Sequence, residues 1–218
     1  MKKLLFLVLI IANSMLLLGQ QKSYDFLAEQ YCKELKKTDF SHKTASEINF
    51  TFFDAGALIR KEYADTIARI DSIIKATNDT LSPFEVDHLF SNQYLITMIN
   101  NCRYYLNVNR LLLDSCPADN KSLQYIAIKI NSYFMINPNL SAQQIQSKSL
   151  EIIGEALTEI KEQVALDYTD GLNNPMLITD IRLYLLHKSD AYMKAWLLNQ
   201  SQHLFPPRET KKTVNPKK

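Results

Sequence analysis

Apolar residues recur every three or four positions along most of the chain, which is the spacing of one buried face of an α-helix. The clearest of these stripes runs from Ile48 to Ile74. No sustained alternation of apolar and polar residues, the pattern of a half-buried strand, lies between strong turn signals. The pattern therefore predicts an all-α protein with six helices, at roughly 23–37, 44–77, 82–115, 120–136, 141–169 and 174–204.

Helix-start residues are found where these predicted helices begin. Ser82 to Glu85 combines a capping box with a proline at the first helical position, and the boxes Thr44 to Glu47 and Ser141 to Gln144 repeat the arrangement. Asn174-Pro175 marks the start of the last helix, and Asp170-Gly171 marks the end of the helix before it. Because mostly long amphipathic helices are joined by short connections, we expect a bundle of antiparallel neighbours.

The N-terminus has the layout of a secretory signal peptide. Lys2 and Lys3 precede an apolar run from Leu4 to Leu18, in which Asn13 and Ser14 are the polar residues. This run of about 15 residues suits a signal peptide, whereas a transmembrane helix needs about 20. We expect a cleaved signal peptide over residues 1–20, with an uncleaved anchor as the alternative. After the signal peptide we expect a single helical domain over residues 21–205 and then a disordered basic tail over residues 206–218.

The distribution of charge argues against a nucleic-acid partner. The chain contains 25 basic and 23 acidic residues, and removal of Lys2 and Lys3 makes these numbers equal. The segment 206–218 has five basic residues and one acidic residue, so the predicted domain has a net charge of −4. Phosphate binding needs a basic surface. We therefore expect no nucleic-acid partner, and membrane contact only through the basic tail or an uncleaved signal peptide.

Three cysteines, Cys32, Cys102 and Cys116, favour one disulfide if the protein is exported to an oxidising compartment. Cys102 and Cys116 are 14 residues apart, or about 21 Å along a continuous helix, whereas bridged Cα atoms lie within about 7 Å. These two cannot pair unless the helix breaks near Asn107–Asn109. We therefore expect Cys32 to pair with Cys102 or Cys116, and three reduced, buried cysteines are the alternative.

The sequence contains no recognisable catalytic, cofactor or metal motif. Glu85 and His88 have the spacing of ligands in di-iron helical bundles, but those sites need a second such pair and further carboxylates. After residue 20, no two glycines are closer than 17 residues, which excludes the glycine-rich loops that hold phosphates. We therefore predict no cofactor and no metal, and we favour a non-enzymatic role.

Eleven tyrosines are present, and aromatic side chains with a polar tip suit both partner surfaces and the wet edge of a helical core. The interpretation we favour is an exported, non-catalytic helical protein that binds another protein in the periplasm, elsewhere in the bacterial envelope, or outside the cell. The alternative is an exported enzyme or small-ligand binder, whose site would be assembled from Asp39, His42, Glu85 and His88.

Overall fold

The computed structural model describes residues 2–77 and 79–204, and the side chains of residues 19–77 and 79–201. Within these ranges the chain is helical and has no strand, which confirms the all-α prediction for this part of the protein. No helix among the described residues is long and apolar enough to cross a membrane. The predicted basic tail, 206–218, lies outside the described residues, and so do the side chains of residues 1–18 in the predicted signal peptide.

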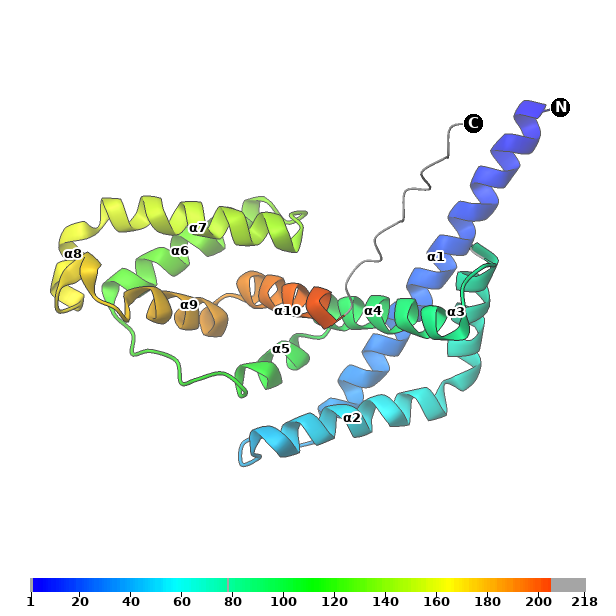
Figure 1. Ribbon diagram of the computed structural model, residues 1–218, viewed down its shortest axis with the longest axis horizontal. Helices are drawn as coiled ribbons and strands as arrows, with labels where there is room; N and C mark the ends of the chain where they lie inside the picture. The colour runs from blue at the N-terminus through cyan, green and yellow to red at the C-terminus, as the bar shows by residue number, and fades with distance from the viewer. Residues whose placement is uncertain (1, 78, 205–218) are drawn as a thin grey trace, which may run out of the picture.

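Figure 1 shows how the helices are arranged. Helices α1 to α5 form one half of the molecule, helices α6 to α9 form the other, and α10 lies between them. The elements are α1 (Lys2–Leu35), α2 (Ala45–Glu62), α3 (Ala64–Thr77), α4 (Pro83–Asn101), α5 (Arg103–Arg110), α6 (Lys121–Ile136), α7 (Ala142–Glu159), α8 (Lys161–Asp167), the 3-10 helix η1 (Gly171–Asn173), α9 (Leu177–Lys188) and α10 (Asp190–Leu204).

The four longest predicted helices are each divided in two, so the prediction of six mostly long helices is wrong about their number and length. The breaks lie at Tyr63, Cys102, Ile160 and Ser189. Cys102 has φ −110° and ψ 89°, and Ser189 has φ −120° and ψ 114°, both outside the helical range. None of the four is a glycine or proline, the residues with the lowest helix propensity.

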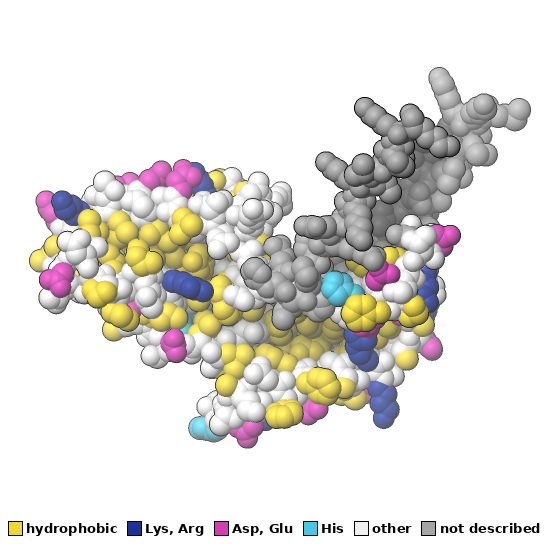
Figure 2. Space-filling view, viewed as in Figure 1, with side chains coloured by type: hydrophobic (Ala, Val, Ile, Leu, Met, Phe, Trp, Pro, Cys, Tyr) yellow, Lys and Arg dark blue, Asp and Glu magenta, His cyan; other side chains and the backbone are white. Residues whose placement is uncertain are grey.

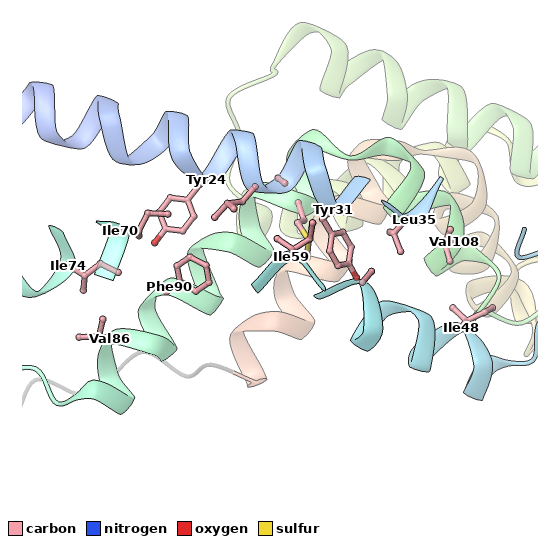
Figure 3. Close-up of a cluster of buried hydrophobic side chains, with 14 of the residues drawn as sticks. Tyr24, Tyr31, Leu35, Ile48, Ile59, Ile70, Ile74, Val86, Phe90 and Val108 are labelled. Carbon is pink, nitrogen blue, oxygen red and sulfur yellow. The ribbon is translucent and has the colours of Figure 1, made fainter. Parts of the chain in front are cut away.

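The first half of the molecule is built around a hydrophobic core of aliphatic and aromatic side chains, shown in Figure 3. Tyr24 of α1 is buried beside Phe90 of α4, with their ring centroids 5.7 Å apart. Tyr31 is buried two turns further along α1, and its hydroxyl donates to the backbone carbonyl of Phe52 at 3.1 Å. The rings therefore supply apolar area while the hydroxyl of Tyr31 remains satisfied by the backbone of α2.

The second half has its own core, formed mainly by α6 to α9. Ile130 of α6, Ala156 of α7 and Val164 of α8 are each fully buried there. Asp167, at the end of α8, accepts hydrogen bonds from the backbone amide and the hydroxyl of Ser122 at 2.8 Å and 2.7 Å. This carboxylate satisfies two buried donors in the first turn of α6 and links the two helices.

A third apolar cluster joins the two halves. Ile99 of α4 and Leu106 of α5 pack with Met193 and Leu197 of α10. Beside this cluster, the largely buried side chain of Arg110 donates to the backbone carbonyl of Leu186 at 2.9 Å and to the carboxylate of Asp190 at 2.8 Å. Helix α10 is therefore in contact with both halves.

The structure pairs Cys32 with Cys102, one of the two pairings expected from the sequence. The distance argument against pairing Cys102 with Cys116 assumed a continuous helix and is wrong in that respect, because α5 ends at Arg110. The sulfur atoms are 2.08 Å apart and the Cα atoms are 5.7 Å apart. Cys116 remains a free thiol in the non-helical segment between α5 and α6. The disulfide therefore links the first helix to the residue at which α4 ends and α5 begins.

Candidate functional site

A polar groove of about 550 Å³ lies between α7, α9 and α10. Its lining includes four amide side chains, two aromatic rings and one guanidinium group, and it includes no carboxylate, imidazole or thiol. The lining residues are Gln143, Gln146, Leu150, Arg182, Tyr192, Ala195, Trp196, Asn199 and Gln200. We call this surface the amide groove.

Helix α7 forms one wall of the amide groove with Gln143, Gln146 and Leu150, which are spaced by three and four residues along one helical face. The opposite face carries Ile152 and Ala156, which are buried in the core of the second half. Burial of that apolar face turns the amide side chains of α7 outward. The polar wall of the groove is therefore a consequence of the amphipathic pattern of α7.

Helix α10 forms the other wall, and its direction is set at Ser189. The backbone there leaves the helical conformation, and the Ser189 hydroxyl accepts the amide hydrogen of Tyr192 at 3.2 Å, as an N-terminal cap does. Met193 and Leu197 are buried against the first half of the molecule. Tyr192 and Trp196, four residues apart, line the amide groove.

One hydrogen bond crosses the groove from wall to wall. The side-chain amide of Asn199 donates to the side-chain carbonyl of Gln146, with a nitrogen-to-oxygen distance of 2.6 Å. A side-chain amide has two donor hydrogens and an acceptor oxygen. After this bond is made, Gln146 keeps both of its donor hydrogens, and Asn199 keeps its carbonyl oxygen and one hydrogen. The groove therefore offers donors and acceptors close together.

Trp196 lines the groove and is half-buried. Its indole nitrogen is buried and has no acceptor within the described part of the chain. Burial raises the pKa of Tyr192, and the guanidinium of Arg182 opposes that rise. Arg182 is exposed and forms no ion pair with any described residue. The groove thus combines neutral amides and apolar ring surface with one positive charge.

The four residues proposed for an alternative active site are not brought together. Asp39 and His42 lie in the loop before α2, whereas Glu85 and His88 lie in the first turns of α4. Figure 1 shows these two places at opposite ends of α2. The Glu85 carboxylate accepts the amide and hydroxyl hydrogens of Ser82 at 2.8 Å, so it serves as part of the capping box. The amide groove contains none of the four.

Asp39 forms a local turn. Its Oδ1 accepts the amide hydrogen of Ser41 at 2.9 Å and the hydroxyl hydrogen of the same residue at 2.8 Å. These hydrogen bonds lower the pKa of the Asp39 carboxyl. Within the described residues, no group of three or more histidine, cysteine, aspartate or glutamate side chains is placed to hold a metal ion.

Every one of the eleven tyrosines is buried or half-buried, and Tyr192 lines the amide groove. Tyr104 is one example: its hydroxyl donates to the backbone carbonyl of Thr38 at 3.2 Å. Sequence reasoning missed the amide groove, since Gln143, Gln146 and Gln200 resemble an ordinary solvated helix face. The available signal was the single tryptophan, Trp196, among polar residues of the last helix.

The chain matches no family model, no curated protein and no solved structure.

Proposed function

We propose that the protein is an exported, non-catalytic binding protein of the bacterial envelope or the extracellular space. In this proposal, the amide groove holds an extended segment of a partner protein. The observation that carries the proposal is the lining of the groove, which combines four amide side chains with the rings of Tyr192 and Trp196. Amide side chains match the alternating donors and acceptors of a peptide backbone, and aromatic rings add apolar contact area.

A binding role is favoured over catalysis by the ionisable groups of the groove. General acid–base catalysis uses a group that gains and loses a proton near the working pH. The lining offers only Arg182 and Tyr192. An arginine side chain remains protonated in proteins, and burial raises the pKa of Tyr192 still further from neutrality. The lining therefore suits recognition of a ligand better than proton transfer.

Export is supported by two independent features of the chain. The first is the charged and apolar layout of residues 1–20. The second is the pairing of Cys32 with Cys102, because structural disulfides persist mainly in oxidising compartments. Together these features favour the periplasm or the extracellular space as the working compartment.

A second candidate uses the same groove for a small polar ligand such as an oligosaccharide. It is favoured by Trp196, which lines the groove beside amide side chains and has its indole nitrogen buried. A sugar ring stacks its carbon–hydrogen face on an aromatic ring while its hydroxyl groups bond to amides. This candidate and the peptide candidate differ in the size and chemistry of the captured molecule.

Site-specific photo-cross-linking in the host envelope tests the proposal. A photoreactive residue replaces Gln200, which is exposed in the lining of the groove. The matched control places it at Gln124, an exposed residue of α6 outside the lining. We expect one protein adduct from position 200 and none from position 124. An adduct of sugar mass would support the second candidate, and equal labelling from both positions, or none from either, would contradict a binding role for the groove.

A further inference from the structure

One face of α2 is exposed along its whole length, although it carries two phenylalanines. Phe50 is 66% exposed and Phe53 is 74% exposed. The opposite face of α2 holds Ile48, Ala55 and Ile59, which are buried in the core of the first half. Figure 1 places α2 along the lower edge of the molecule, and Figure 2 shows hydrophobic side chains projecting there. The packing of α2 against its own chain therefore buries only the face with Ile48, Ala55 and Ile59. The face with Phe50 and Phe53 remains exposed.

The exposed face has the residue spacing of a helix-pairing surface. Phe50, Phe53 and Ala57 follow one another at three and four residues, as do the central positions of a coiled coil. Glu47, Asp54 and Lys61 are spaced by seven residues and border the same face. We call these six residues the α2 stripe, and all of them are exposed.

The α2 stripe is complementary to an antiparallel copy of itself. Two α2 helices related by a two-fold axis near Phe53 and Asp54 place the ring of Phe50 opposite the small side chain of Ala57 in the other copy. In the same arrangement Glu47, whose Oε2 also accepts the amide and hydroxyl hydrogens of Thr44, meets Lys61 of the other copy, once at each end. The start of the stripe carries a large side chain, Phe50, and an acidic one, Glu47. Its end carries a small side chain, Ala57, and a basic one, Lys61. An antiparallel copy therefore places the large side chain opposite the small one and the acidic group opposite the basic one.

We propose that the α2 stripe is a homodimer interface whose occupant is a second copy of this chain. A two-fold interface must be complementary to itself, and the α2 stripe meets that requirement in both shape and charge. An 18-residue helix is only about 27 Å long, so the buried area is small. Small interfaces give weak, reversible association. This proposal uses α2 alone and is independent of the amide groove.

Sedimentation equilibrium of the purified protein, between about 1 μM and about 1 mM, tests the proposal. We expect a reversible equilibrium between monomer and dimer. Phe53→Ser removes a central ring and should raise the dissociation constant at least about tenfold. The matched control is Phe84→Ser, because Phe84 is 78% exposed but lies on α4 and does not belong to the α2 stripe. That control should leave the dissociation constant unchanged.

Charge variants separate this interface from unspecific apolar association. Lys61→Glu replaces two attractive pairs with two repulsive ones and should weaken the dimer roughly tenfold. Asp54→Asn removes the like charges that meet at the two-fold axis and should tighten the dimer about twofold. Circular dichroism verifies that each variant is folded. A protein that is monomeric at every concentration would overturn the proposal, as would a dimer that Phe53→Ser and Phe84→Ser weaken equally.

Discussion

Cys32 is bonded through its sulfur atom to Cys102, which is also the residue at which α4 ends and α5 begins. The Cys102 sulfur accepts the amide hydrogen of Tyr105 at 3.3 Å, so it caps the first turn of α5. On either side of Cys102, Ile99 and Leu106 are buried against α10. The disulfide therefore holds α1 against the helix junction that supports the contact between the two halves of the molecule.

We expect Cys32→Ser to lower the free energy of unfolding by about 4 kcal/mol, since the disulfide closes a long loop in the unfolded chain. The two cysteines are 70 residues apart in sequence. Cys32 is the better position to change because Cys102 also caps α5. Urea unfolding under oxidising conditions measures the effect. Cys116→Ser is the control, and equal losses from the two variants would show that the disulfide does not provide the stabilisation.

Arg110→Lys should destabilise the fold by about 2 kcal/mol, because a lysine cannot reproduce three hydrogen bonds from a planar guanidinium. The Arg110 side chain is 12% exposed and donates to Leu186, Asp190 and Asn107. Arg103→Lys is the matched control, since Arg103 also pairs with Asp190 but is 80% exposed. We expect that control to cost less than about 1 kcal/mol. Guanidinium unfolding distinguishes the two, and comparable losses would refute the importance of the buried contact.

The contribution of Asp167 to stability should decrease in acid. Burial alone would raise the pKa of this carboxyl, but hydrogen bonds from the Ser122 hydroxyl and amide and from Gln163 outweigh burial and lower it. A lowered pKa in the folded state means that the contribution is complete above the unfolded-state pKa, near 4. It is lost as the pH falls through the lower, folded-state pKa.

We therefore expect the stability difference between the wild-type protein and Asp167→Asn to shrink as the pH falls from about 5 to about 2. Urea unfolding at several pH values measures this difference. Asp170→Asn is the control, because it removes an exposed carboxylate from the neighbouring turn. A difference that shrinks equally for both variants would argue against the role assigned to the Ser122 hydrogen bonds.

Gln146→Ala should reduce partner capture in the amide groove about tenfold while changing stability by less than about 1 kcal/mol. Its side chain is exposed and accepts one hydrogen bond from Asn199. Gln124→Ala, on the exposed face of α6, is the control. The yield of the photo-cross-link at position 200 measures capture. Unchanged capture in Gln146→Ala would exclude this amide from the binding surface.

The helical class and several helix starts could be predicted from the sequence, because both depend on residues within one turn of each other. The capping boxes Thr44 to Glu47, Ser82 to Glu85 and Ser141 to Gln144 are confirmed, with reciprocal hydrogen bonds in each. Asn174-Pro175 is less accurate: Asn174 accepts the amide of Met176, and α9 begins only at Leu177. Local hydrogen bonding identifies the turn, but not the first helical residue.

The breaks inside the predicted long helices could not be read from the sequence. Tyr63, Cys102, Ile160 and Ser189 are compatible with a continuous helix, and the apolar spacing runs through them. Cys102 and Ser189 leave the helical conformation where α4, α5, α9 and α10 meet in the third apolar cluster. Packing between distant helices outweighs a local preference that is worth less than about 1 kcal/mol per residue.

The sequence by itself determined that the chain folds into amphipathic helices with defined caps, and it favoured a disulfide that involves Cys32. Only the tertiary structure selected Cys102 as the partner, and only it brought Gln146 and Asn199, 53 residues apart, to the two walls of one groove. The physical reason is the range of the interactions. A helix is stabilised by contacts three or four residues apart, whereas a groove depends on which faces of separate helices are buried together.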